Sequence, residues 1–252
     1  MSSCLFDQSG INIINHRTNK TVLYLKKIII DNFNTSDDYL SWSENNYRNK
    51  VLDVQNQINK ANFSQLISSE IKESIFKFLG EKEFLIQSNV YLRASRPKKE
   101  KHLEEAIDWH RESFYGPNVE SAANIWTPAY NVNEQNTLQF IPKSQLINSS
   151  EIKLSQFDHP TVKRGSSSHR IGYLYAPKKI LSGVDLSSKT KMVVPDFSSS
   201  IFPAELIHGA GMNHSHLVRY SVDFRIIGKS QYNVDLNKNE NLNSKNPYFI
   251  PF

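Results

Sequence analysis

The 252-residue chain lacks the features that mark several large classes of protein. Its single cysteine, Cys4, excludes an internal disulfide and a zinc site built from cysteines. No apolar run approaches the ~20 residues that a membrane-spanning helix needs, and the first residues lack the pattern of a secretory signal. We therefore expect a cytoplasmic protein without a membrane partner.

Charge of one sign is not concentrated anywhere in the chain. The net charge of +5 is scattered, and the densest basic run, RPKKEK at residues 96–101, is short and interrupted by a glutamate. A nucleic-acid site needs a basic stripe or patch, so this run predicts a solvated loop and no nucleic-acid partner. The sequence leaves the oligomeric state open.

The first 85 residues carry helical patterns. Residues 39–59 and 63–79 have apolar side chains at helical spacing, with Ser64 expected to cap the second helix and Gly80 to end it. The apolar run at residues 21–31 favours a strand instead.

Beyond residue 84 the chain is a series of short segments rich in aromatic and β-branched residues. These segments are 84–95, 124–130, 137–142, 169–175, 191–195, 204–209 and 217–227. Helices followed by many strands predict a mainly β sandwich or barrel with helices packed on one side.

The length fits a single domain. We expect an N-terminal helical part (1–85), a β core (86–228) and a polar tail (229–252). Residues 146–168 lack periodicity, which is typical of a long loop over a site.

The stretch DWHRES, residues 108–113, places a histidine and a carboxylate two residues apart. On a strand, His110 and Glu112 would project from the same face, whereas Arg111 between them would lie on the outer face. Such a pair is half of a metal site if a third ligand arrives from elsewhere. It is also what a salt-bridged surface strand looks like.

The segment LIHGAGMNHSHLVRYS supplies a candidate third ligand, His208. Two histidines and one carboxylate form the facial triad of non-haem Fe(II) oxygenases, which leaves positions open for a 2-oxo acid and dioxygen. Arg219 follows eleven residues later, and a guanidinium binds a carboxylate through two charge-assisted hydrogen bonds. Arg219 is therefore a candidate to hold the far carboxylate of the 2-oxo acid, and a buried ion-pair role is the alternative. Ser221, expected beside it on the same strand, is a candidate for a contact with the 2-oxo acid, and ordinary strand packing is the alternative.

The combination of His110-x-Glu112, His208 and Arg219 resembles the phytanoyl-CoA dioxygenase family of Fe(II)/2-oxoglutarate-dependent oxygenases. The resemblance is closest in HGAGMNHS, residues 208–215, and extends to WTPA (126–129) and LQFIPKS (138–144). It covers roughly residues 86–228. This chain departs from the family in having Glu112 where aspartate is usual, and in the loops around Asn136-Thr137 and residues 142–145.

The resemblance implies a double-stranded β-helix (jelly-roll) core with the N-terminal helices packed against it. It implies Fe(II) held by His110, Glu112 and His208, with 2-oxoglutarate and O2 as cosubstrates and Arg219 and Ser221 as the 2-oxoglutarate anchor. The implied reaction is hydroxylation of an unactivated C–H bond in a small-molecule substrate. A cupin-type metal enzyme that does not use 2-oxoglutarate, and a non-catalytic binding barrel, are the alternatives.

Other residues near these motifs have two interpretations each. Asn213 either caps the turn after His208 or contacts the cosubstrate. Arg93, Tyr115 and Trp126 are candidates for the wall of the substrate cavity, with core packing as the alternative for the two aromatic residues. His214 and His216 are interpreted as side chains that point away from the metal or lie behind its ligands.

Overall fold

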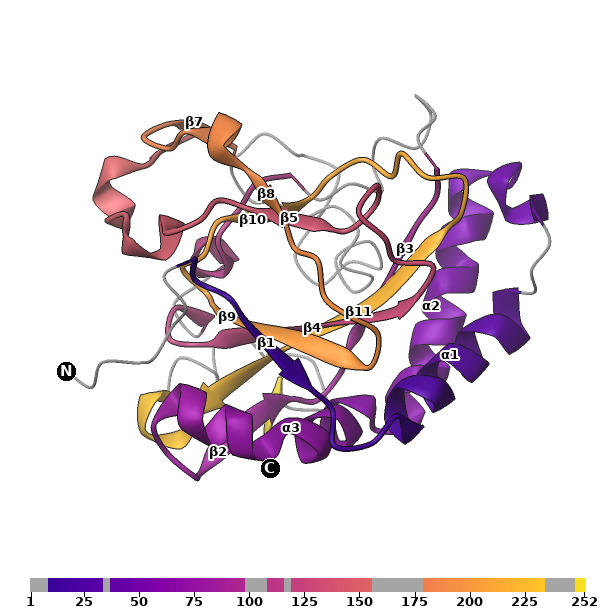
Figure 1. Cartoon of the computed structure of the whole chain (residues 1–252), viewed down its shortest axis with the longest axis horizontal. Coiled ribbons are helices and arrows are strands. Elements are labelled where there is room, and N and C mark those ends of the chain that lie inside the picture. The colour runs from indigo at the N-terminus through magenta and orange to yellow at the C-terminus, as the bar shows by residue number, and fades with distance from the viewer. Residues whose placement is uncertain (1–8, 34–36, 98–107, 116–118, 156–178, 234–247) are drawn as a thin grey trace.

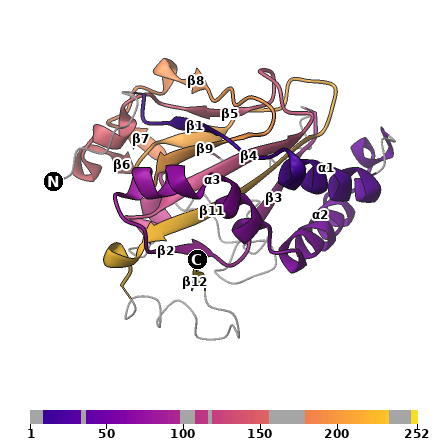
Figure 2. The same ribbon diagram turned by 60° about the horizontal axis from the view of Figure 1, so that its bottom comes forward.

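The computed structural model describes residues 9–33, 37–97, 108–115, 119–155, 179–233 and 248–252. A seven-stranded sheet forms the centre, three helices cover one of its faces, and a three-stranded sheet lies on the other side (Figure 1). In both views β5 and β8 lie on one side of the large sheet and α3 lies on the other (Figure 2). The jelly-roll architecture with helices on one side is as predicted.

Neighbouring strands in the two sheets run antiparallel. The large sheet has the order β1-β9-β4-β11-β2-β12, and β3 also pairs with β11. Its strands are β1 Asn12–Asn15, β2 Phe84–Gln87, β3 Tyr91–Ser95, β4 Ala123–Tyr130, β9 Ser198–Pro203, β11 Arg219–Gly228 and β12 Phe249–Pro251.

The small sheet has the order β10-β5-β8. Its strands are β5 Leu138–Phe140, β8 Thr190–Lys191 and β10 His208–Ala210, and a separate pair is formed by β6 Lys153–Leu154 and β7 Ile180–Ser182. Because β5 and β10 face β4 and β9 across the interior, Trp126 and Phe202 of the large sheet share a core with Leu138 and Phe140 of the small one.

The helices are α1 Lys20–Phe33, α2 Glu44–Lys60 and α3 Phe63–Leu79. The predicted bounds of α3 are confirmed, and Gly80 ends it with φ 73°, a left-handed conformation that glycine adopts without strain. Its N-cap is Asn62, not Ser64, which is buried within the first turn. Helix α2 starts later than predicted, because Ser43 caps it by accepting a hydrogen bond from the Asn46 backbone N–H at 3.4 Å.

The prediction of a strand at residues 21–31 is wrong, because this segment lies in α1. The β-branched run favours a strand locally, but Val22, Leu25, Ile29 and Phe33 recur at helical spacing and are all buried. Burial of that stripe against α2, α3 and the sheet outweighs the local preference.

Several strands depart from the predicted segments. Segment 84–95 is two strands, and β9 begins with three serines that are all buried, although serine usually marks a turn. Strand β1 lies in the part expected to be helical, and β12 lies in the part expected to be a polar tail. Both strands join the large sheet. The segment 169–175 and most of the predicted loop 146–168 lie outside the described residues.

Strand β11 positions the site through its alternation. Tyr220, Val222, Phe224 and Ile226 point into the core beneath the helices. The intervening residues, Arg219, Ser221, Asp223 and Arg225, therefore point toward the small sheet.

Across the described residues, none of the helices combines the length and apolar character needed to cross a membrane.

Candidate metal centre

The three predicted ligands come from two segments that meet at the inner edge of the small sheet. His110 pairs with His208 as an isolated β-bridge, with N–H···O distances of 3.0 Å in both directions. Glu112 is not on a strand: it begins a 3₁₀ helix, Glu112–Tyr115, and its backbone N–H donates to the Ala204 carbonyl at 2.9 Å. The predicted strand geometry is therefore wrong, although the side chains still converge.

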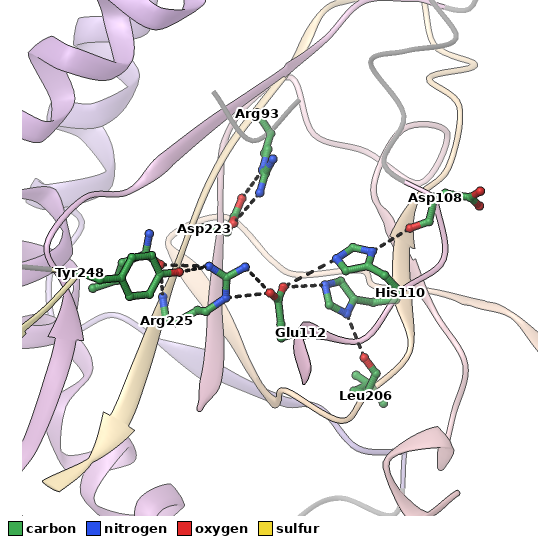
Figure 3. Close-up of polar contacts among 10 residues, drawn as sticks. Arg93, Asp108, His110, Glu112, Leu206, Asp223, Arg225 and Tyr248 are labelled. Carbon is green, nitrogen blue, oxygen red and sulfur yellow. Dashed lines mark hydrogen bonds and ion pairs between the residues drawn. The ribbon is translucent and has the colours of Figure 1, made fainter. Parts of the chain in front are cut away.

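His110, Glu112 and His208 form a compact buried cluster. Each offers one ligand atom, and these atoms all lie within 4.8 Å of one another. Glu112 Oε1 lies 3.7 Å from His110 Nε2 and 3.5 Å from His208 Nε2. Figure 3 shows the carboxylate facing both imidazole rings.

Backbone carbonyls fix the orientation of both imidazoles. His110 Nδ1 lies 2.7 Å from the Asp108 carbonyl oxygen, and His208 Nδ1 lies 2.9 Å from that of Leu206. A carbonyl only accepts, so in the neutral ring each Nδ1 carries the proton and donates it. Each Nε2 then has a lone pair directed at the cluster, which is how metal-binding histidines are usually held.

The charges of the cluster also suit a divalent metal. Burial would raise the pKa of Glu112, but the Arg225 guanidinium holds it well below its usual range, so the carboxylate is ionised. Burial, together with the neighbouring His208, lowers the pKa of His110, which keeps this imidazole neutral. A deprotonated carboxylate and neutral imidazoles are the forms that bind metal. The residues thus fit a divalent ion of the Fe(II) type.

A cavity opens beside the cluster, between the two sheets. Its wall includes the three candidate ligands and the residues Arg93, Ala94, Ser95, Asn124, Trp126, Leu138, Phe202, Ala210, Arg219 and Asp223. Asn124 Nδ2 and Trp126 Nε1 are buried there and have no hydrogen-bond partner among the described residues.

The predicted 2-oxoglutarate anchors lie on one face of β11. Arg219 is buried, lines the cavity and donates from Nη1 to the Asn136 carbonyl at 3.0 Å. Ser221, two residues along, is completely buried, and its hydroxyl has no hydrogen-bond partner within the described part of the chain. Ser221 is not among the residues that line the cavity.

Asn213 holds the loop between β10 and β11. Its Nδ2 donates to the carbonyls of Ser95 at 2.8 Å and Leu217 at 2.7 Å, and its Oδ1 accepts from the Ser215 backbone N–H at 2.9 Å. Of the two roles that the sequence leaves open for Asn213, the structure shows the turn-capping one. His214 and His216 in the same loop are exposed, whereas the three candidate ligands are buried.

The candidate substrate residues divide into three cases. Arg93 lines the cavity and forms a two-pronged ion pair with Asp223, at 2.5 and 2.9 Å. Trp126 both lines the cavity and belongs to the core between the sheets. The side chain of Tyr115 lies outside the described part of the structure.

Arg111 does not lie on an outer face, and that prediction is wrong. Its side chain is completely buried and donates to the Ile147 carbonyl at 2.7 Å, to the Ser144 carbonyl and to the Ser149 hydroxyl at 3.0 Å, while Glu205 lies 3.1 Å away. The planar guanidinium satisfies several acceptors of one loop at once, which explains why it is buried.

Sequence reasoning missed two charged residues of the site, Asp223 and Arg225. Arg225 pairs with Glu112, and Asp223 pairs with Arg93. The signal was present in RYSVDFRI, where every second residue from Arg219 is polar and the intervening ones are apolar. This period of two puts both charges on the same face as the predicted anchor.

Comparison with known proteins agrees with this arrangement. The sequence model of the phytanoyl-CoA dioxygenase (PhyH) family matches residues 27–221, and the chain belongs to that family. No curated protein matches the sequence.

Solved structures share the fold at low identity. The non-haem α-ketoglutarate-dependent carbocyclase SnoK of nogalamycin biosynthesis is 12% identical with a TM-score of 0.53, covering 97% of this chain and 92% of its own. EvdO2 from Micromonospora carbonacea var. aurantiaca, complexed with 2-oxoglutarate, is 14% identical with a TM-score of 0.52, covering 90% and 91%. The epimerase SnoN is 13% identical with a TM-score of 0.52, covering 95% and 86%.

Proposed function

We propose that this protein is an Fe(II)- and 2-oxoglutarate-dependent dioxygenase that hydroxylates an unactivated C–H bond of a small molecule. One observation carries the proposal. His110, Glu112 and His208 converge in a buried cluster, and the Arg219 guanidinium lines the same cavity. Membership of the phytanoyl-CoA dioxygenase family and the 2-oxoglutarate in the EvdO2 complex support the same assignment.

In this proposal His110, Glu112 and His208 hold the iron through two Nε2 atoms and one carboxylate oxygen. Fe(II) bound there supplies, with 2-oxoglutarate and O2, the oxidising chemistry of the reaction. Arg219 binds the far carboxylate of 2-oxoglutarate through its planar fork, and the Ser221 hydroxyl adds a further donor to that carboxylate. Asn213 acts indirectly, because it holds the loop that leads into Arg219.

The remaining cavity wall receives the substrate. The Arg93–Asp223 pair makes part of this wall polar, whereas Trp126, Leu138, Phe202 and Ala210 make part of it apolar. We propose a compact substrate with oxygen-bearing groups beside a C–H-rich part. SnoN is an epimerase and SnoK is a carbocyclase, so the mass of the product has to be measured.

The assignment is tested with the purified full chain under anaerobic conditions. Addition of 2-oxoglutarate to the Fe(II)-loaded protein is expected to produce a visible charge-transfer absorption band, and succinate should give none. A cupin-type enzyme or a simple binding barrel would show no such band. Turnover with candidate metabolites should release succinate and add one oxygen atom to the product. A product of unchanged mass would replace hydroxylation with epimerisation and leave the cofactor assignment intact.

A further inference from the structure

The Glu112 carboxylate has a buried charged partner outside the metal cluster. Arg225 on β11 donates from Nε to Glu112 Oε2 at 2.8 Å, and its Nη2 contacts the same oxygen. Both side chains are buried, at 10% and 5% relative exposure. Figure 3 shows the guanidinium on the side of the carboxylate opposite the two imidazoles.

The two oxygens of Glu112 therefore face different partners. Oε1 faces the histidines, 3.5 and 3.7 Å from their Nε2 atoms, while Oε2 is occupied by Arg225. A carboxylate held in this way offers a metal one oxygen in a fixed direction, because rotation about its last bond would break the two contacts with the guanidinium. Such outer contacts commonly set the orientation of metal ligands.

Arg225 is itself held by the part of the chain near its C-terminal end. Its Nη1 contacts the Tyr248 hydroxyl and lies 3.5 Å from Gln87 Oε1, which also accepts from the Arg225 backbone N–H at 3.1 Å. Tyr248 directly precedes β12, and β12 pairs with β2 so that Phe249 lies opposite Gln87. Tyr248 and Gln87, at this end of the large sheet, thus hold the guanidinium in place.

We propose that Arg225 is a positioning residue that fixes Glu112 as a one-oxygen metal ligand, and that Tyr248 braces Arg225. This inference rests on the proposed function, since it concerns the same metal. It also accounts for glutamate at this position. A carboxylate that starts from the 3₁₀ helix must reach the histidines and Arg225 together, and aspartate is one methylene shorter.

The test measures Co(II) affinity of the full-length protein by calorimetry, with the visible Co(II) spectrum recorded on the same samples. Arg225→Met is expected to weaken Co(II) binding roughly 10–100-fold, the usual range for loss of a partner that orients a ligand. Its spectrum should also change, because the freed Oε2 alters the ligand set. Arg225→Lys should recover part of the affinity, and Tyr248→Phe should lose less than Arg225→Met.

Three further variants separate this role from a structural one. In a Glu112→Ala background, Arg225→Met should cause no additional loss of Co(II) affinity, because the partner through which it acts is gone. Glu112→Asp should weaken Co(II) binding although it restores the residue usual in the family. Arg96→Met removes another buried arginine, which pairs with Glu44 and does not line the cavity, and should leave Co(II) affinity at the wild-type level.

The outcomes distinguish this inference from the proposed function. Wild-type protein that binds neither Co(II) nor Fe(II) overturns the proposed function. Wild-type protein that binds Co(II) while Arg225→Met binds it equally well, with an unchanged spectrum, overturns the positioning role alone. If Arg225→Met keeps its Co(II) affinity and loses affinity for 2-oxoglutarate instead, Arg225 contacts the cosubstrate and the inference is wrong. Should Arg225→Met fail to fold, Glu112→Asp and Tyr248→Phe decide between these results.

Discussion

The two faces of β11 differ completely although they alternate residue by residue. Toward the helices the strand presents Tyr220, Val222, Phe224 and Ile226, all in the largest core. Toward the small sheet it presents an arginine, a serine, an aspartate and a second arginine, of which three are charged and largely buried.

The difference shows how one strand serves stability and chemistry separately. The apolar face stabilises the fold by removing hydrocarbon from water. The charged face is costly to bury, and its charges persist because each has a partner: Arg225 with Glu112, Asp223 with Arg93, and Arg219 with the Asn136 carbonyl. A change on one face should therefore alter folding stability, and a change on the other should alter ligand binding.

The largest expected effect is loss of the metal. His208→Ala leaves two ligands, which hold Fe(II) weakly, so stoichiometric binding should disappear while the melting temperature stays close to that of wild type. His214→Ala, an exposed histidine in the following loop, is the matched control and should bind normally. Anaerobic titration with Fe(II) measures both variants. Equal affinity in the two proteins would contradict the triad.

The next effect concerns the cosubstrate anchor. Arg219→Ala should raise the KM for 2-oxoglutarate by a factor of hundreds, because removing a buried charge partner costs ~3–5 kcal/mol. Fe(II) affinity should remain nearly normal, and Arg219→Lys should recover only part because an ammonium lacks the planar fork. Succinate release against 2-oxoglutarate concentration measures the change. Joint loss of iron and fold would instead identify Arg219 as a structural residue.

Phe224→Ala tests whether a change on the apolar face of β11 affects folding stability alone. Removing a phenyl ring from the core should lower the free energy of unfolding by about 3–5 kcal/mol. Because Phe224 points away from the cavity, protein that remains folded should bind Fe(II) with wild-type affinity. Urea unfolding and metal titration on the same sample test both parts. If fully folded Phe224→Ala protein binds Fe(II) more weakly than wild type, the two faces of β11 are coupled.

The smallest effect is expected for Ser221→Ala on the polar face. A hydrogen bond to a charged group contributes about 1.5–3 kcal/mol, so the KM for 2-oxoglutarate should rise roughly tenfold or more. Thermal stability should not fall, since the hydroxyl has no partner in the described protein. An unchanged KM with unchanged stability would favour ordinary strand packing for Ser221.

Much of the site can be predicted from the sequence because its residues lie in recognisable local patterns. HGAGMNHS with Arg219 at a fixed distance, and His110-x-Glu112, resemble a family motif and led to the same cluster that the structure brings together. The alternation in RYSVDFRI also contains the positions of Asp223 and Arg225, although not their partners. Periodicity gives α3 correctly for the same reason, since a local repeat decides which side is buried.

Local patterns failed where distant contacts outweigh them. The segment around Glu112 is held by backbone bonds to His208 and Ala204, not by strand pairing of its own. Arg111 is buried because the loop at residues 144–149 brings carbonyls around it. The apolar run of α1 is helical because the sheet and two helices bury one stripe of it.

The sequence by itself determined the mainly β architecture, the candidate ligands and the alternating character of β11, since these follow from residue type and spacing. Only the tertiary structure decided that Arg225 meets Glu112 from 113 positions away, and that Tyr248 lies behind it. A contact between segments so far apart depends on the register of β11 with its neighbours and on the path of the loops. No local repeat in the chain specifies either of these.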